Sequence, residues 1–297
     1  MKALSLAGLV VASFGRHYEV ELDDGERLSC VTRGKKGGVV CGDRVTIETT
    51  GPDQGVISAI APRESLLYRS DPFREKVIAA NVTQIVVVVA PVPSFYEDLI
   101  GRCLVAAETA GLRALIVLNK CDLVEESARA LERLGIYREL GYSVLPLSAK
   151  RDLSPLLPYI HGQTSVLVGQ SGMGKSTLIN ALLPEARART QEVSEALDSG
   201  RHTTTHATLY HLDRDSHIID SPGLQEFGLH HLKLDEIGAA FVEFRPHLGN
   251  CRFSNCIHLN EPGCAVLHAT AQGDIAPRRL AFYHSLVNEL QNVKKRY

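Results

Sequence analysis

The chain has 297 residues, which is enough for about two domains of ordinary size. Hydrophobic residues make up 44% and charged residues 22% of it, close to globular averages, which excludes a fibrous, coiled-coil or mostly disordered protein. The 32 Lys and Arg nearly balance the 34 Asp and Glu, and the net charge of −2 excludes a surface that is basic all over, so any contact with nucleic acid must be local.

Residues 1–68 are predicted to form a small β-barrel. Strand-like segments at residues 18–22, 28–32, 45–49 and 55–60 are separated by turns rich in Gly, Asp and Pro. Together with a first strand near the N-terminus, this makes about five short strands, a pattern typical of an antiparallel barrel. An oligonucleotide-binding (OB) fold is one candidate, and an SH3-like or other small barrel would give the same pattern.

The apolar run at residues 3–12, directly after Lys2, imitates a short secretory signal. It lacks a clear cleavage site and continues into alternating sequence, so we expect a β-strand there instead. The longest apolar run, residues 85–92, is far shorter than the ~18 residues that a membrane helix needs. We therefore expect a cytoplasmic protein that makes no contact with a membrane.

Residues 69–228 are predicted to form an α/β domain. Their strand-like segments are almost continuously apolar, as in a parallel sheet that helices cover on both faces. The predicted strands are residues 84–90, 113–119, 142–147 and 164–168, and the predicted helices are residues 96–110, 125–140 and 153–161.

A phosphate-loop pattern follows the strand that ends at Val168: a glycine, four residues, then Gly-Lys-Ser before a helix. Its backbone N–H groups would surround a polyphosphate, Lys175 would contact the β- and γ-phosphates, and Ser176 would bind Mg²⁺. A glycine-rich turn with a chance lysine is the alternative, which the strand-loop-helix context disfavours. The nucleotide-binding residues predicted here are Gly169, Gln170, Ser171, Gly172, Met173, Gly174, Lys175, Ser176 and Thr177.

Two further motifs at strand ends predict that the base is guanine. The Asp122 carboxylate can accept hydrogen bonds from N1–H and the exocyclic amine of guanine, a donor pair that adenine does not present. A backbone N–H of the second motif would face O6. The motifs are Asn119, Lys120, Cys121 and Asp122, and then Ser148, Ala149 and Lys150. Simple helix capping after a strand is the alternative for Asn119 and Asp122.

Asp220 and Gly223 belong to an Asp-Ser-Pro-Gly motif after an apolar strand. The acid would hold the Mg²⁺ shell and the glycine N–H would contact the γ-phosphate. Upstream, the polar residues 200–205 could provide a second hydroxyl ligand for Mg²⁺. We favour Thr205, which lies just before the strand predicted at residues 207–212, over Thr204.

Residues 229–297 are predicted to form a zinc-binding domain that ends in a helix at residues 277–293. Three of the seven cysteines crowd together here, and the set Cys251, Cys256, His258 and Cys264 supplies three thiolates and one imidazole. Such a closed set suits one structural Zn²⁺ per chain. His247 and His268 are the rival fourth ligands, and buried free thiols are the alternative to a metal site.

The order of the motifs is the most informative feature. Ordinary GTPases place the phosphate loop first and the two guanine motifs last, whereas here the guanine motifs come first. This circularly permuted order, between a β-barrel and a Cys/His cluster, resembles the RsgA (YjeQ/YloQ) family of small-ribosomal-subunit biogenesis GTPases. The resemblance covers essentially the whole chain and implies an OB-fold barrel and a zinc-binding helical domain around the GTPase domain.

The resemblance also implies partners and an activity. The protein would bind the 30S subunit and its 16S rRNA late in maturation, with GTP hydrolysis to GDP stimulated by the ribosome, and we expect a monomer. Two other interpretations are an RNA-binding scaffold with GTP as a structural ligand, and a phosphate-loop kinase or ATPase.

The residue that activates the attacking water is harder to identify. Ras-like enzymes use a glutamine directly after the Asp-x-x-Gly glycine, but this chain has Leu224 there. His202, in the threonine segment, is the predicted catalytic group, and a histidine in this context is also the proposed one in the family that the chain resembles. Gln225, Arg201 or a ribosomal group are the alternatives.

Overall fold

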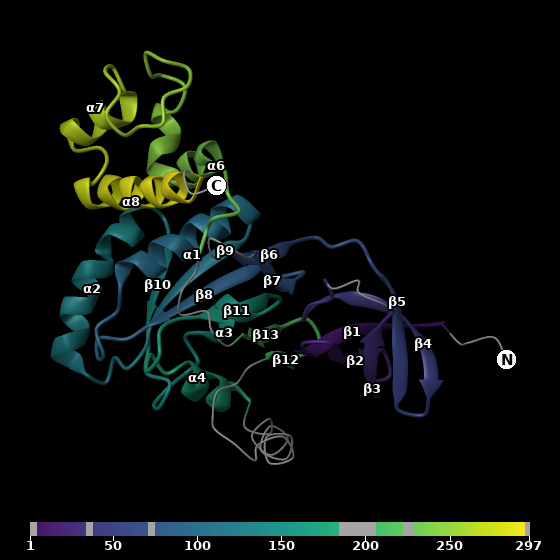
Figure 1. Cartoon of the computed structure of the whole chain (residues 1–297). Helices are drawn as coiled ribbons and strands as arrows, with labels where there is room; N and C mark the ends of the chain where they lie inside the picture. Colours follow the sequence, from purple (N-terminus) through teal and green to yellow (C-terminus); the bar gives the residue numbers. More distant parts are fainter. Residues whose placement is uncertain (1–4, 34–37, 71–74, 184–205, 222–227, 295–297) are drawn as a thin grey trace.

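The computed structural model describes residues 5–33, 38–70, 75–183, 206–221 and 228–294, arranged in three parts (Figure 1). An N-terminal barrel lies at one end of a central α/β sheet, and C-terminal helices pack over helix α1 of that sheet. No helix in these ranges is long and apolar enough to cross a membrane.

The barrel is a closed sheet of five strands. Its strands are β1 (Ser5–Phe14), β2 (His17–Leu22), β3 (Arg27–Thr32), β4 (Arg44–Gly51) and β5 (Gln54–Ile60). They are hydrogen-bonded in the order β1-β2-β3-β5-β4, and β4 pairs back with β1 to close the barrel. Alternate residues such as Val20, Leu28 and Ile47 fill its core. The five-stranded barrel expected from the sequence is confirmed, with the Greek-key order of an OB-fold.

The central sheet is parallel except at one strand. Its parallel strands are, in spatial order, β10 (Ser143–Pro146), β9 (Arg113–Leu118), β8 (Gln84–Val89), β11 (Thr164–Val168) and β13 (His217–Asp220). Strand β12 (Ala207–His211) runs antiparallel beside β13. The helices are α1 (Glu97–Ala110), α2 (Val124–Glu139), α3 (Leu157–Ile160) and α4 (Lys175–Leu182).

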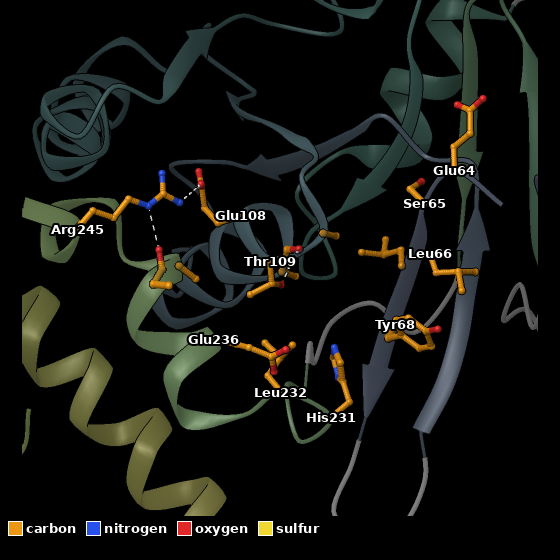
Figure 2. Close-up of a pocket in the computed structure, with 15 residues that line it drawn as sticks. Glu64, Ser65, Leu66, Tyr68, Glu108, Thr109, His231, Leu232, Glu236 and Arg245 are labelled. Carbon is orange, nitrogen blue, oxygen red and sulfur yellow. Dashed lines mark hydrogen bonds and ion pairs between the residues drawn. The ribbon is translucent and has the colours of Figure 1, made fainter. Parts of the chain in front are cut away.

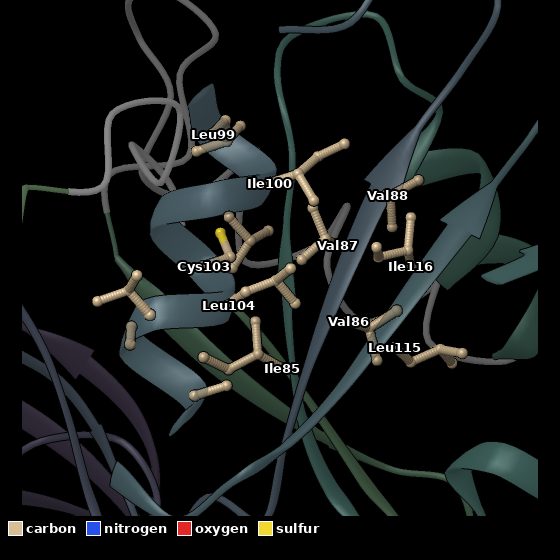
Figure 3. Close-up of a cluster of buried hydrophobic side chains, with 14 of the residues drawn as sticks. Ile85, Val86, Val87, Val88, Leu99, Ile100, Cys103, Leu104, Leu115 and Ile116 are labelled. Atoms are coloured by element: carbon tan, nitrogen blue, oxygen red, sulfur yellow. The ribbon is translucent and has the colours of Figure 1, made fainter. Parts of the chain in front are cut away.

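Strand β8 is apolar at nearly every position because it is covered on both faces. All of its residues are buried, and helix α1 presents Ile100, Cys103 and Leu104 to the same core (Figure 3). A parallel strand in the middle of a sheet requires such a continuous apolar run.

Two features differ from the sequence predictions. The helix expected over residues 153–161 is reduced to α3, because Pro155 disfavours helical backbone at Ser154, whose N–H and hydroxyl bond instead to the Asp152 side chain. The hairpin of β6 (Leu66–Ser70) and β7 (Glu75–Ala80), between the barrel and the central sheet, was not anticipated.

Strand β1 belongs to both the barrel and the central sheet. Its outer end pairs with β12, so the two sheets form one continuous sheet of 11 strands. An irregularity in the β1–β2 register falls between Val10 and Ala12. At this point consecutive residues enter different cores, because Val10 packs in the barrel and Val11 packs in the large core under the central sheet.

The C-terminal part is helical and rests on α1. It contains α6 (Leu234–Ala240), the 3-10 helix η1 (Val242–His247), α7 (Ala265–Gln272) and α8 (Pro277–Lys294). Gly101 of α1 lets the Phe282 ring approach the helix backbone, and Arg102 forms an ion pair with Glu289 of α8 at 2.5 Å. The C-terminal helices are therefore attached by close packing as well as by charge.

We expect Gly101→Ala to lower the free energy of unfolding by about 1–3 kcal/mol, because the added Cβ would lie 2.4 Å from a ring atom of Phe282. Gly135→Ala in α2 is a matched control, since no atom lies within 4 Å of its added Cβ. That substitution should raise stability by about 0.5–1 kcal/mol through helix propensity. Urea unfolding followed by circular dichroism measures both, and equal effects would contradict this account of the packing.

Candidate functional site

The predicted nucleotide-binding motifs meet at one edge of the central sheet. The carboxyl ends of the parallel strands β8, β9, β10, β11 and β13 all reach this edge, where ligands bind in open α/β sheets. The predicted phosphate loop follows β11, and α4 begins at Lys175. Motifs that are far apart in the sequence thereby become neighbouring loops.

The glycines of the phosphate loop are required by close contacts. Gly174 has a φ of +91°, and a Cβ there would lie 2.3 Å from the side-chain nitrogen of Asn119. A Cβ at Gly169 would lie 2.3 Å from the carbonyl oxygen of Val88. Only glycine fits either position, because the backbone of the loop passes directly against neighbouring strand ends.

Lys175 points back into the phosphate loop. Its ammonium group donates hydrogen bonds to the carbonyl oxygens of Gly169 and Gln170. Burial lowers the pKa of Lys175, and the charge of Asp220 opposes that shift. The next two residues, Ser176 and Thr177, are exposed in the first turn of α4. A cation and free helix N–H groups together suit an anionic ligand.

The side chain of Asn119 connects three loops. It is 2% exposed, and its amide group donates a hydrogen bond to the Met173 carbonyl at 3.0 Å. Its oxygen accepts from the N–H groups of Lys120 at 2.8 Å and Ala149 at 2.9 Å. The sequence predicted a base contact or a helix cap here. In the structure, its hydrogen bonds connect the phosphate loop with both predicted guanine motifs.

Asp122 is oriented by the second guanine motif. The Ser148 hydroxyl donates a hydrogen bond of 2.7 Å to its carboxylate, and this bond is the main reason that the pKa of Asp122 is lowered. The carboxylate is therefore ionised at neutral pH and accepts hydrogen bonds only. The sequence had assigned to this motif a backbone contact with the base, so the orienting role of the Ser148 side chain was missed.

The other residues of these two motifs shape the loops. Lys120 has a φ of +63°, and its ammonium group donates to the Val92 carbonyl at 2.8 Å. The N–H of Cys121 donates to the Leu147 carbonyl at 3.0 Å, while Lys150 is exposed. This set of contacts fixes the strand ends on either side of Asp122.

Asp220 ends strand β13 next to the phosphate loop. Burial raises its pKa, and the positive charges of Lys175 and His206 oppose that rise. The half-buried carboxylate of Asp220, at the end of β13, and the exposed hydroxyl of Ser176, in the first turn of α4, are the hard oxygen ligands that Mg²⁺ prefers. The residues present thus fit a magnesium site.

Several predicted residues lie outside the described ranges. They are His202, Thr204, Thr205 and Gly223, together with the alternatives Arg201 and Gln225. The first residue described after the threonine segment is His206, which the sequence analysis did not single out.

A metal-ligand cluster forms in the C-terminal part. The ligand atoms of Cys251, Cys256, His258 and Cys264 all lie within 4.8 Å of one another. Nδ1 of His258 lies 3.5, 3.5 and 3.3 Å from the three sulfur atoms, in chain order. The Sγ atoms of Cys251 and Cys264 are 3.9 Å apart, close to the edge of about 3.8 Å expected for a tetrahedron with metal–sulfur bonds of ~2.3 Å.

The cluster therefore fits a tetrahedral metal ion with no open ligand position. Three thiolates and one imidazole are ligands that suit Zn²⁺. Neither rival ligand, His247 or His268, belongs to the cluster.

Hydrogen bonds around the cluster hold its loop. The Glu261 carboxylate accepts from three backbone N–H groups, including that of Ile257 at 2.9 Å. Nε2 of His284, on α8, lies 2.8 Å from the carbonyl oxygen of His258, and the Tyr283 hydroxyl donates to the Ile257 carbonyl at 2.9 Å. The metal loop is thereby attached to the long C-terminal helix.

A cavity of about 670 Å³ lies apart from the nucleotide site, between β6, the end of α1 and α6 (Figure 2). Its wall includes the ion pair of Glu108 with Arg245 and the Tyr68 ring, 5.4 Å from that of His231. No residue of the predicted nucleotide or metal sites lines it.

The chain resembles known proteins over nearly its full length. Residues 60–230 match the RsgA GTPase family. The protein named "Small ribosomal subunit biogenesis GTPase RsgA" of Nitrosospira multiformis is 58% identical over 285 residues, 96% of this chain and 91% of that relative. The protein of the same name from Nitrosomonas europaea is 57% identical over 290 residues, 97% of this chain and 92% of that relative.

Two solved structures share the fold. The structure titled "YjeQ from Thermotoga maritima" has a TM-score of 0.75 and 32% identity, covering 97% of this chain and 99% of the other. The structure titled "YloQ, a circularly permuted GTPase" has a TM-score of 0.72 and 27% identity, covering 99% and 96%. The second title describes YloQ as a circularly permuted GTPase.

Proposed function

The chain belongs to the RsgA family of GTPases, and from that premise we propose that it is a ribosome-stimulated GTP hydrolase acting late in maturation of the 30S subunit. The named relatives are GTPases of small ribosomal subunit biogenesis. One structural observation supports the activity most directly: the Asn119 amide joins the phosphate loop to both guanine motifs.

In this proposal the nucleotide lies along the strand ends. Asp122, oriented by Ser148, accepts from N1–H and the exocyclic amine of guanine. The N–H groups of the phosphate loop and of the first turn of α4 surround the phosphates. Lys175 exchanges its two carbonyl partners for the β- and γ-phosphates. The proposed GTP-binding residues are those of the three motifs named above, together with Thr205, Asp220 and Gly223.

Magnesium would be held by hydroxyl groups and the nucleotide. Ser176 and Thr205 are the proposed ligands, and Asp220 would hold the water shell of the ion. When bound, Mg²⁺ would offset the charge that develops on the phosphate oxygens during hydrolysis. We propose His202 as the group that orients the attacking water, because Leu224 occupies the position of the Ras-like glutamine.

The flanking parts would provide the contacts with the ribosome. We propose three domains, at residues 1–68, 69–228 and 229–297, with one structural Zn²⁺ in the last. The barrel and the C-terminal part would bind 16S rRNA in the 30S particle. GTP or GDP would control docking and release of a monomer that works in the cytoplasm without contacting a membrane.

We expect Asp122→Asn to change the base preference. A site built on hydrogen bonds to a substrate group rejects analogues that lack the group by roughly 10⁴–10⁵-fold. The variant should therefore lose GTP and favour xanthosine triphosphate, whose C2 oxygen can accept from the new amide. Competition binding measures the change, with Asp152→Asn as a control on a neighbouring exposed turn. An unchanged preference for GTP in Asp122→Asn would remove the guanine assignment.

We expect the purified chain to carry about one Zn²⁺, because the cluster has one tetrahedral set of ligands. Cys256→Ala should lose the metal and increase amide exchange in α7, whereas Cys30→Ala, in the barrel core, should keep it. Because the cysteine thiols must lose their protons to bind the metal as thiolates, zinc affinity should fall as the pH falls. Elemental analysis combined with hydrogen exchange tests this, and a metal-free wild type with an ordered α7 would refute it.

We expect the 30S subunit to accelerate GTP turnover from an intrinsic rate on the order of 10⁻⁴ s⁻¹, as in an unassisted small GTPase. His202→Ala should remove most of this stimulation and leave GTP affinity nearly unchanged, while His161→Ala, at an exposed loop histidine, should match the wild type. Turnover of GTP and ATP with and without 30S particles measures the effect. A fully stimulated His202→Ala enzyme would transfer the role to Gln225, Arg201 or a ribosomal group.

A further inference from the structure

Residues 90–96, which connect β8 to α1, lie against two parts of the nucleotide site. The Tyr96 N–H donates a hydrogen bond of 2.9 Å to the side-chain oxygen of Gln170, in the phosphate loop. The carbonyl of Val92 accepts from the ammonium group of Lys120, in the first guanine motif, at 2.8 Å. We call residues 90–96 the bridging loop, because they contact both the phosphate loop and a guanine motif.

The contact with Gln170 bears on the position of Lys175. The backbone carbonyl of Gln170 accepts a hydrogen bond from the Lys175 ammonium group at 3.0 Å, while its side chain accepts from the bridging loop. Pro93 also packs on the phosphate loop, since a Cβ at Gly172 would lie 3.3 Å from Cγ of Pro93. A shift of the bridging loop would therefore move the backbone that is proposed to surround the phosphates.

Arg133 of α2 holds the other side of the bridging loop. Its guanidinium group donates to the Ser94 hydroxyl at 3.3 Å and to the Phe95 carbonyl at 3.2 Å. The centre of this group lies 4.1 Å from the centroid of the Phe95 ring, which is buried. Nε donates to the Glu97 carboxylate at 3.1 Å. All three nitrogen atoms of one side chain thus hold the end of the bridging loop and the start of α1.

The same contacts reach the C-terminal part of the chain. Arg278, in the first turn of α8, donates to the Arg133 carbonyl at 3.3 Å and lies 3.6 Å from the second carboxylate oxygen of Glu97. Glu97 therefore lies between one arginine of α2 and one arginine of α8. The long C-terminal helix, to which the metal loop is attached, is thereby connected with the bridging loop.

We propose that Arg133 is a positioning residue for the phosphate loop, and that through Glu97 it couples helix α8 to nucleotide binding. The inference rests on the proposed function, since it assigns regulation to the nucleotide site described there. The planar fork of Arg133 reaches three acceptors at once, which the point charge of a lysine cannot do. Coupling between two sites is reciprocal, so bound nucleotide should order the bridging loop, and a partner that moves α8 should change nucleotide affinity.

The test measures the affinity of the full chain for fluorescent methylanthraniloyl-GDP, and for GMP by competition. Arg133→Met retains a side chain over the Phe95 ring but loses the three polar contacts. Because couplings between sites typically amount to about 5–150-fold, and this side chain is 42% exposed, we expect about tenfold weaker binding of the GDP analogue. GMP has no β-phosphate for Lys175 to contact, so its affinity should stay at the wild-type value.

Arg129→Met is the matched control, because Arg129 is exposed on the same helix, four residues earlier. It removes the same charge and should leave both affinities unchanged. Arg133→Lys keeps the charge but not the fork, so its binding of the GDP analogue should remain several-fold weaker. Equal weakening of GDP and GMP binding in Arg133→Met would indicate general loosening of the site and would overturn the proposal. Unchanged GDP binding, or full restoration by Arg133→Lys, would overturn it as well.

The connection with α8 has its own measurement. Arg278→Met should weaken binding of the GDP analogue several-fold. The double variant with Arg133→Met should bind it no more weakly than Arg133→Met alone, because both changes act on the same contact. Multiplicative effects of the two changes, or an Arg278→Met protein with wild-type affinity, would contradict the coupling to α8.

Hydrogen exchange provides a readout without turnover. In the wild type, bound methylanthraniloyl-GDP should slow exchange of the Tyr96 amide, which donates to Gln170, and Arg133→Met should reduce this protection. Exchange at Tyr96 that is indifferent to nucleotide in the wild type would count against the inference. Wild-type protein that does not bind the GDP analogue would refute the proposed function itself, whereas normal binding with wild-type behaviour of Arg133→Met would refute only the positioning role.

Discussion

The buried side chain of Asn119 is the interaction on which the candidate site depends. Its amide satisfies a carbonyl of the phosphate loop and an N–H of the loop after β10, two segments that no local hydrogen bond would hold together. Each buried polar group left without a hydrogen-bond partner would lower the stability of the fold by about 1–3 kcal/mol. A displacement of any one of the three loops would therefore disfavour the positions of the other two. The close approach of Asn119 to Gly174 then explains why the loop has glycine there.

The permuted order changes which parts of the molecule are joined directly to the nucleotide site. The spatial order of the central strands depends on their pairing and not on the chain order, so the loops still meet at one edge. The connections differ, because β13 now leads toward the C-terminal helices and β12 lies against the barrel. The barrel is therefore attached through β12, which pairs with β13, the strand that ends at Asp220.

Short contiguous patterns in the amino-acid sequence were enough to predict several parts of this protein. The barrel strands follow from alternating residues between turn signals, and β8 follows from an apolar run that only a doubly covered strand can accommodate. The phosphate loop, the guanine motifs and the Cys/His cluster are equally local. Their residue types carry the chemistry, and their order along the chain was enough to indicate a permuted GTPase.

Contacts between residues that are distant in the chain became visible only in the folded protein. It grouped His258, and neither His247 nor His268, with the three cysteines, gave Asn119 hydrogen bonds to two neighbouring loops, and paired β1 with β12. It also placed the His206 ring against Phe14, the last residue of β1. No periodicity or residue spacing in the sequence predicts these contacts. Each contact forms between elements that the complete fold brings together.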